Sequence, residues 1–214
     1  DGDAIAAYRK SVAAKPDVFE SNLNLGLQLA KNKSPDAEQF LRAATQLKPT
    51  SHPSEGLARA WLSLAHVIET SKPDDALAAY RQAATLQPND PEPHLSAGLI
   101  LEKQNQFSDA EKEYKQALAL DPGSSDAVVG LANIYMRGHR FPEAEAELKK
   151  ITAAHPDLPA AHLQLGRVLK EENKNEEAVS ELELATKLAP ADATAQRELA
   201  DLYSTTGKHD KAAA

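Results

Sequence analysis

The sequence predicts an all-α protein built from repeated helix hairpins, and three observations lead to this fold class. Alanine is abundant while aromatic residues make up only 5% of the 214 residues. This composition favours helices, because alanine loses no side-chain entropy when the chain coils. Small and large residues also recur with a helical period. Finally, Pro16, Pro49, Pro88, Pro122, Pro156 and Pro190 follow one another at intervals of 33, 39, 34, 34 and 34 residues. Such a period is typical of a repeat architecture.

The segment before each of these prolines is expected to form the second helix of a hairpin. A small residue is followed four positions later by a large one and seven positions later by a third residue on the same helical face. The first two positions are Ala4 and Tyr8, Ala37 and Leu41, Ala76 and Tyr80, Ala110 and Tyr114, Ala144 and Leu148, and Ala178 and Leu182. The third position is Ser11, Ala44, Ala83, Ala117, Ile151 or Ala185. The stripe predicts one buried face on each second helix.

The segment after each proline carries a different stripe and is expected to form the first helix of the next hairpin. Its members are Leu25-Gly26 with Leu29, Leu64-Ala65 with Ile68, Ala97-Gly98 with Leu101, Leu131-Ala132 with Tyr135, Leu165-Gly166 with Leu169, and Leu199-Ala200 with Tyr203. The small residue of each pair lets a partner helix approach closely. The two stripes together predict tight antiparallel hairpins.

Turns are predicted from proline and glycine. Each recurrent proline ends a second helix, because it lacks an N–H donor and clashes with the preceding turn. Gly138 and Gly207 are expected to mark the turn inside two hairpins. The extra residues Thr50 to Gly56 are rich in Ser, Pro and Gly and predict a surface bulge. That bulge is interpreted as a tolerated insertion or, alternatively, as a partner-specific feature.

These motifs resemble the tetratricopeptide repeat, a pattern of roughly 34 residues with Trp, Leu-Gly and Tyr followed by Ala, a large residue, Ala and Pro. One unit is close to a complete copy, with Trp61, Leu64-Ala65, Ile68, Ala76, Tyr80, Ala83 and Pro88. The Trp position is Asn22, His94, Val128, His162 or Gln196 in the other units. The resemblance covers essentially the whole chain. It implies a right-handed superhelical solenoid of about twelve antiparallel helices.

The register divides the chain into one array without separate domains. A partial repeat at 1–16 precedes whole repeats at 17–49, 50–88, 89–122, 123–156 and 157–190, and a second partial repeat occupies 191–214. Terminal repeats usually carry a polar capping face, and neither end of this sequence has one. We therefore expect the segment to come from a longer protein.

Several classes of function are excluded at this stage. A net charge of -8 and a pI near 5.4 provide no electrostatic source for binding nucleic acid or an anionic membrane surface. The absence of cysteine rules out disulfides, thiolate nucleophiles and sulfur-ligated zinc. No apolar stretch approaches the roughly 18 residues of a membrane span, so we expect a soluble chain with no direct membrane insertion.

Catalytic signatures are missing as well. The chain has no phosphate-binding glycine loop, no His-Glu-x-x-His pair and no nucleophile elbow. His94 and His162 occupy the same repeat position in different units, too far apart to share a metal. We expect no catalytic residue, no cofactor and no metal. The compartment stays open between cytoplasmic and extracytoplasmic.

The resemblance also implies where a partner would bind. In this family the first helices line a concave groove, and the positions one residue after the Trp site, and four and seven residues further, face it. Carried across, these are Leu23, Leu27 and Ala30; Leu62, His66 and Glu69; Leu95, Leu99 and Glu102; Val129, Asn133 and Met136, with Arg137 beside them; Leu163, Arg167 and Lys170; and Arg197, Asp201 and Ser204. The predicted groove is aliphatic in the early units and more polar later. The alternative for its leucines is that they fill the inner wall.

The resemblance finally implies a non-catalytic scaffold that binds an extended or helical peptide segment of another protein in this groove. The clamp of Lys-Asn, Asn and Lys-Arg that some members use for a terminal carboxylate is absent, since Leu23 and Leu27 stand at its first positions. Two alternatives remain. The segment would be the recruiting or regulatory arm of a multidomain enzyme whose catalytic domain lies elsewhere, or a structural array that associates end to end through its uncapped ends.

Overall fold

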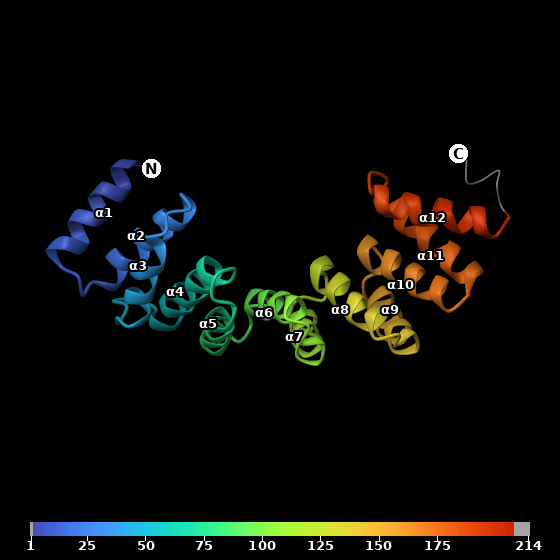
Figure 1. Ribbon diagram of the computed structural model, residues 1–214, viewed down its shortest axis with the longest axis horizontal. Helices are drawn as coiled ribbons and strands as arrows, with labels where there is room; N and C mark the ends of the chain where they lie inside the picture. The colour runs from blue at the N-terminus through green and yellow to red at the C-terminus, as the bar shows by residue number, and fades with distance from the viewer. Residues whose placement is uncertain (1, 208–214) are drawn as a thin grey trace. The chain divides into compact units, whose positions relative to one another are not determined.

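The computed structural model describes residues 2–207, which form twelve α-helices and no strand (Figure 1). The end of the second partial repeat, residues 208–214, lies outside these residues. The helices are α1 (Gly2–Ala14), α2 (Phe19–Lys31), α3 (Ala37–Thr45), α4 (Pro53–Ile68), α5 (Pro73–Leu86), α6 (Glu92–Lys103), α7 (Phe107–Leu120), α8 (Ser125–Arg137), α9 (Phe141–Ala154), α10 (Pro159–Glu171), α11 (Asn175–Leu188) and α12 (Ala193–Thr205). The fold is an all-α helical repeat solenoid.

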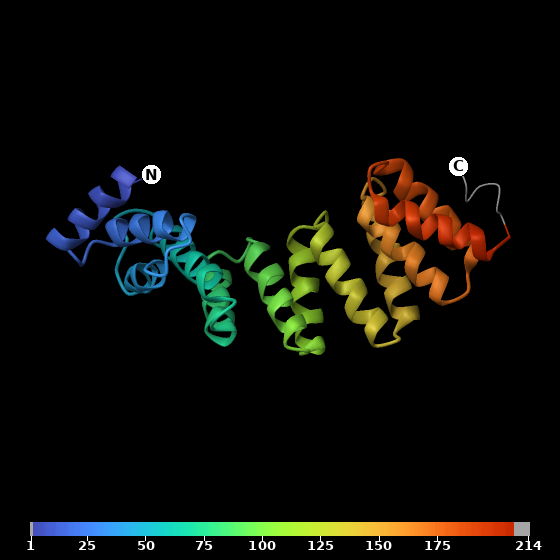
Figure 2. The ribbon, with the colours of Figure 1, turned by 45° about the horizontal axis from the view of Figure 1, so that its top comes forward.

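The chain divides into two compact units, residues 1–100 and residues 101–214, with the border inside α6. In unit 1, α2 packs on α3, α4 packs on α5, and α3 joins the two pairs by packing on α4. In unit 2, each helix from α7 to α12 packs on the next, and α10 also contacts α8 and α12. Figure 2 shows these neighbouring helices running antiparallel within each unit. First helices therefore lie beside first helices in both units.

The second-helix stripe is buried in α3, α5, α7, α9 and α11, apart from the half-buried Ile151. The prediction was wrong for α1, where Ala4 and Tyr8 are half-buried and Ser11 is exposed. Tyr80 and Tyr114 are 1% and 0% exposed, and the alanines four positions before them are fully buried. The small residues of the first helices allow the second helix of the same hairpin to pack closely. A Cβ atom on Gly26 would lie 2.7 Å from a side-chain carbon of Leu41, so a larger residue there would force Leu41 to shift. Gly166 stands in the same relation to Leu182.

Hairpin turns depend on left-handed residues that recur along the chain. Asn105, His139, Asn173 and Gly207 have φ angles of 60°, 53°, 60° and 75°. Gly138 lies in the turn between α8 and α9, as the sequence predicts, although its φ is -84° and the next residue, His139, takes the left-handed conformation. Gly207 lies in the turn after α12, and the rest of the hairpin that it was expected to mark falls outside the described residues.

The extra residues before Trp61 form helix where a bulge was expected. Pro53 begins α4, a position where proline costs nothing because the first helical N–H groups have no partner, and α4 reaches 16 residues against 13 for α2. Only Thr50 to His52 stay outside a helix. Glu20 holds this short link, since its Oε1 atom accepts from the Thr50 backbone N–H at 2.8 Å and from its hydroxyl at 2.6 Å. These hydrogen bonds lower the pKa of Glu20.

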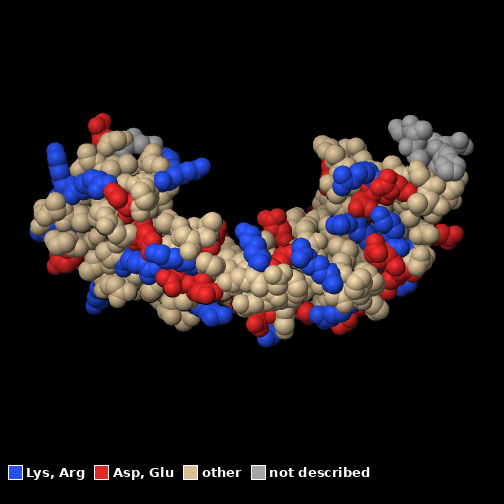
Figure 3. Space-filling view, in the orientation of Figure 1, with Lys and Arg blue, Asp and Glu red and all other residues tan. Residues whose placement is uncertain are grey.

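Successive second helices are joined by a recurring set of ion pairs, here called carboxylate bridges. In each, a glutamate on a second helix pairs with a cation one turn later on its own helix and with the residue that precedes the next second helix. The three bridges are Glu38 with Arg42 and Lys72, Glu111 with Lys115 and Arg140, and Glu145 with Lys149 and Lys174. Their N–O distances run from 2.6 to 2.8 Å. Figure 3 shows the corresponding intermixing of basic and acidic side chains within each unit.

Candidate partner-binding surface

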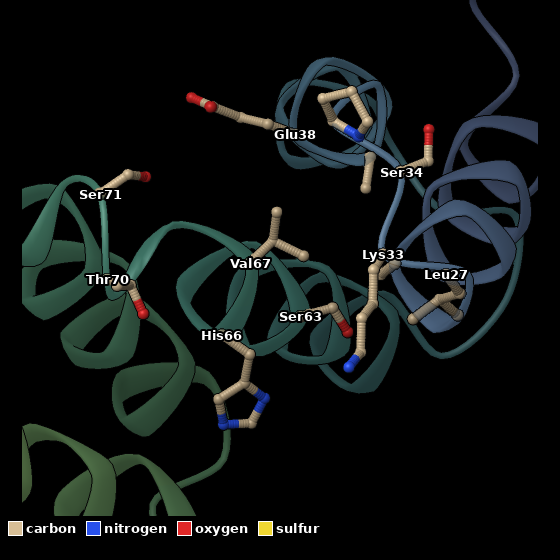
Figure 4. Close-up of a pocket in the computed structure, with 12 residues that line it drawn as sticks. Leu27, Lys33, Ser34, Glu38, Ser63, His66, Val67, Thr70 and Ser71 are labelled. Carbon is tan, nitrogen blue, oxygen red and sulfur yellow. The ribbon is translucent and has the colours of Figure 1, made fainter.

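The first helices α2 and α4, together with the start of α3 and the turns after α2 and α4, line an open pocket of about 810 Å³, here called the α2–α4 pocket (Figure 4). It is lined by Leu27, Ala30, Lys33, Ser34, Pro35, Ala37, Glu38, Ser63, His66, Val67, Thr70 and Ser71. Three of these residues, Leu27, Ala30 and His66, belong to the predicted groove. The structure thus brings groove positions from two consecutive repeats to one cavity.

The wall of the α2–α4 pocket is partly apolar and partly polar. Leu27 and Ala30 come from α2 and Val67 comes from α4, and Val67 also packs against the core around Leu25 and Leu29. Hydroxyl groups are supplied by Ser34, Ser63, Thr70 and Ser71. Pockets that bind ligands commonly combine apolar contact area with a few polar groups that fix orientation.

The charged residues that line the pocket differ in whether they form an ion pair. Glu38 accepts from Lys72 at 2.6 Å and from Arg42 at 2.8 Å, and these two bonds lower the pKa of its carboxyl. Lys33 differs, because no carboxylate among residues 2–207 pairs with its ammonium. In Figure 4 its side chain leaves the α2–α3 turn and extends beside Ser63. The open charge at this pocket is therefore positive.

His66 lies at the solvent side of the pocket. Its Nε2 atom is 3.4 Å from Glu92 Oε1, and its ring meets the ring of Tyr80 edge-on at a centroid distance of 5.4 Å. Both His66 and Glu92 are more than 40% exposed, so this pair contributes little to stability. The imidazole is held at the surface, where a partner can reach it.

The two glutamates predicted for the groove, Glu69 and Glu102, already have internal partners. The hydroxyl of Tyr80 donates to Glu69 at 2.7 Å, and that of Tyr114 donates to Glu102 at 2.8 Å. Burial and the nearby carboxylate raise the pKa of both tyrosines. These glutamates satisfy buried hydroxyls, a role that the sequence did not suggest.

The remaining groove positions of unit 1 differ in exposure. Leu23 is 6% exposed and belongs to the core, while Leu62 and Leu95 are half-buried. Leu99 is 41% exposed and is the only large apolar side chain that counts as exposed among the described residues. Leu99 is thus the leucine of the predicted set with the most surface open to a partner.

In unit 2 the groove positions lie on α8, α10 and α12. Asn133 and Met136 are half-buried, Arg137 and Arg197 are exposed, and Leu163 is 7% exposed and packed in the core. The guanidinium of Arg137 stacks over the ring of Phe107 at 5.7 Å.

Arg167 and Lys170 share one internal partner. Glu198 Oε2 lies 2.5 Å from Lys170 Nζ, and Glu198 Oε1 lies 3.4 Å from Arg167 Nε. Arg167 also donates to Gln164 at 3.1 Å. The glutamate is only 14% exposed. A carboxylate from the next repeat thus already occupies the two cations that were predicted as donors for a ligand.

Sequence reasoning missed Lys33 and Ser63 in unit 1 and Glu198 in unit 2. Lys33 sits in a turn, outside the helical period on which the groove prediction depends. Ser63 and Glu198 lie one position to the side of groove residues on their own helices, and their neighbours come from adjacent repeats. A rule that considered hairpin turns together with the first helices would have found Lys33.

Within residues 2–207, no three His, Cys, Asp or Glu side chains gather in a way that could hold a metal ion. No helix in that range has the length and apolar character needed to cross a membrane.

The fold and this surface define a class of protein, the α-helical repeat proteins that present a face of consecutive first helices. Two family models described as tetratricopeptide repeat match the sequence, one over residues 101–168 and the other over residues 2–52 and 163–214. The chain belongs to the tetratricopeptide repeat family. No curated protein matches its sequence.

Solved structures with the same fold include several repeat proteins. YrrB, described as a tetratricopeptide repeat protein with an unusual peptide-binding site, is 18% identical, and the match covers 91% of this chain and 98% of that chain with a TM-score of 0.65. The pilF protein of Pseudomonas aeruginosa is 22% identical over 91% and 87% of the two chains, with a TM-score of 0.65. A tetratricopeptide repeat protein from Parabacteroides merdae is 18% identical over 91% and 75%, with a TM-score of 0.68.

Family membership carries a general function. Tetratricopeptide repeats are protein–protein interaction scaffolds that bind proteins or peptides, and the fold is generally non-catalytic. Membership in this family therefore indicates that the chain is a protein–protein interaction scaffold.

Proposed function

We propose that this chain is a non-catalytic scaffold that holds an extended or helical peptide segment of another protein against its first-helix faces. In unit 1 the α2–α4 pocket serves as an anchor point for that segment. The observation that carries the proposal is the convergence of Leu27, Ala30 and His66 on one cavity of about 810 Å³. Those residues come from two repeats, and a bound peptide would join them.

Exposure supports the same surface. His66 and Leu99 are each 41% exposed, and an exposed large leucine on a first helix loses water contact when a partner covers it. A peptide that contacts several consecutive first helices gains affinity from many modest contacts, as repeat proteins allow. The likeness to YrrB, which is described as having a peptide-binding site, is consistent with this use of the fold.

The proposal is tested by selecting from a displayed library of random 12-residue peptides against the whole chain. The dominant peptide is then synthesised, and its dissociation constant is measured by titration calorimetry against the parent chain and two variants. Leu27→Lys places a charge in the α2–α4 pocket. Ala78→Lys places the same charge on the exposed face of α5, outside the pocket, and is the matched control.

With Leu27→Lys the affinity is expected to fall by about fivefold or more, because truncating or charging an anchor residue costs more than about 1 kcal/mol. With Ala78→Lys the dissociation constant is expected to stay unchanged. Circular dichroism melting checks that both variants fold. Equal affinity of the Leu27→Lys variant and the parent chain for the selected peptide would remove the α2–α4 pocket from the binding surface.

A further inference from the structure

The α2–α4 pocket has an asymmetry of charge that bears on the kind of peptide it takes. Its apolar contacts come from Leu27, Pro35 and Val67, and its single carboxylate, Glu38, is already neutralised by Lys72 and Arg42. Lys33 remains with an ammonium that no described carboxylate pairs. An unpaired cation beside an apolar wall favours a ligand that offers a carboxylate next to an aliphatic group.

The wider charge of unit 1 permits such a ligand. Residues 1–100 contain ten Lys and Arg against twelve Asp and Glu, whereas residues 101–214 contain fourteen against twenty. Most of the negative charge of the chain therefore belongs to unit 2. Within unit 1, charges more than about one Debye length from the pocket, roughly 8 Å at physiological salt, are screened. The positive charge of Lys33 then determines which ligand charge the α2–α4 pocket prefers.

The polar groups of the pocket fit the same occupant. Ser63 on α4 and Ser34 on the turn that carries Lys33 provide hydroxyl donors, and Thr70 provides another after the end of α4, whereas the Ser71 hydroxyl already donates to the Ile68 carbonyl at 3.3 Å. A carboxylate accepts hydrogen bonds only, so it is satisfied by an ammonium together with hydroxyl donors. An extended peptide also presents backbone carbonyls to the remaining hydroxyls.

The geometry points to an internal acidic motif as the occupant: the α2–α4 pocket binds a peptide segment in which an aliphatic residue is followed by Asp or Glu, with the carboxylate at Lys33 and the aliphatic group on Leu27 and Val67. This assignment rests on the proposed function, because it names the segment that the same pocket anchors. It differs from capture of a free chain end, since the carboxylate belongs to a side chain.

The test uses three hexapeptides with acetylated and amidated ends, which removes terminal charge. Their sequences are Gly-Ser-Leu-Glu-Ser-Gly, the same with Gln in place of Glu, and the same with Lys in place of Glu. Each is titrated into the ¹⁵N-labelled chain at low salt, and the amide shifts of Ser34, Ser63 and Val67 are followed. The Lys33→Gln variant removes the cation. The Lys31→Gln variant removes a neighbouring exposed cation that does not line the pocket.

The Glu peptide is expected to bind about two- to fivefold more tightly than the Gln peptide, a ratio typical of a part-exposed ion pair, and the Lys peptide is expected to bind most weakly. The ratio falls to about one in Lys33→Gln and persists in Lys31→Gln. Raising the salt concentration lowers it, because exposed charges are screened.

Two other outcomes separate this inference from the proposed function. Equal affinity for all three peptides, with shifts at the pocket amides, would overturn the acidic preference and leave peptide binding at the α2–α4 pocket in place. Binding that shifts other amide signals but not those of Ser34, Ser63 and Val67 would overturn the inference. That outcome would also count against the α2–α4 pocket as an anchor point. A preference for Glu that survives Lys33→Gln would assign the preference to another cation.

Discussion

The Nε2 atom of His162 lies 3.0 Å from the carbonyl oxygen of Pro156, six residues earlier in the chain. Asn22 repeats this relationship, since its Nδ2 atom donates to the Pro16 carbonyl at 2.8 Å. Gln196 repeats it as well, donating to the Pro190 carbonyl at 2.7 Å. These three residues stand where the family pattern has tryptophan. A polar side chain there satisfies a carbonyl beside the end of the preceding helix, which otherwise lacks an intrahelical donor.

Removing this hydrogen bond is expected to destabilise the array. His162 is 4% exposed, and its Nδ1 atom also faces Glu181 at 2.6 Å. His162→Ala should lower the free energy of unfolding by about 1 to 3 kcal/mol, because it removes a buried side chain together with its hydrogen bonds to Pro156 and Glu181. His162→Gln should recover part of that loss, as Gln196 makes the same bond at its own site. Urea unfolding measures both variants, and equal losses would show that the proline carbonyl bond contributes nothing.

Gly130 allows α8 to approach α7 closely. A Cβ atom at this position would lie 2.3 Å from a ring carbon of Tyr114, which is fully buried. Gly130→Ala should therefore cost about 1 to 3 kcal/mol through overpacking. Gly138→Ala is the control, because its Cβ atom would meet only the flexible Arg140 side chain at 3.4 Å and a carbonyl at 3.5 Å, and its φ of -84° suits any residue. An unchanged urea midpoint for Gly130→Ala would contradict this packing.

The carboxylate bridges predict loss of stability in acid. Burial by itself raises the pKa of Glu111, but hydrogen bonds from Arg140 and Lys115 outweigh it and set the pKa to about 2, below the ordinary 4.5. Hydrogen bonds from Lys149 and Lys174 set the pKa of Glu145 to about 2 as well. A folded-state pKa below the unfolded value means that the stabilisation is complete above about pH 4.5 and is lost as the pH falls towards 2.

Neutral variants measure this contribution. Glu111→Gln should lower the free energy of unfolding at pH 7 by about 1 to 2 kcal/mol, a figure reduced for the part-exposed cations. Its deficit relative to the parent chain should shrink as the pH falls below 4.5. Glu176→Gln removes the same charge from an exposed position and should change little at any pH. A deficit for Glu111→Gln that is the same at pH 7 and pH 3 would contradict the bridge.

Leu99 and Leu101 test the two faces of α6. Leu99 is 41% exposed and Leu101 is 2% exposed. Leu99→Glu should leave the melting temperature nearly unchanged, because surface substitutions usually lie within about 0.5 kcal/mol. Leu101→Glu should destabilise by more than about 3 kcal/mol, since it buries an unpaired charge. Comparable melting of the two variants would show that the register of α6 is wrong.

Much of the fold could be predicted because its causes are local. The small and large residues at a helical period define buried faces, and prolines end the helices within a few residues of where they stand. Pro53 shows the limit of this reasoning. A cluster of Ser, Pro and Gly indicated a bulge, yet proline at the start of a helix is compatible with the helical conformation, so α4 was extended instead.

The candidate site was harder to predict, because its decisive contacts join separate repeats. Arg167 and Lys170 were interpreted as open donors, but Glu198 of a later repeat pairs with both. Leu23 and Leu163 fit the groove register, yet packing against their neighbours buries them. Leu27 and His66 meet at one pocket only because α2 and α4 lie side by side. A periodic pattern identifies a helical face but not the residues that cover it.

The carboxylate bridges have a consequence for how the array loses its structure. Each glutamate pairs with a cation of the next hairpin only, so each bridge stabilises the contact between two neighbouring hairpins. Opening an end hairpin therefore breaks one bridge and leaves the next intact, and the array can open stepwise from its ends. In unit 2, backbone amides beside Glu145, whose helix α9 packs on both α8 and α10, are then expected to exchange with solvent more slowly than those of α12.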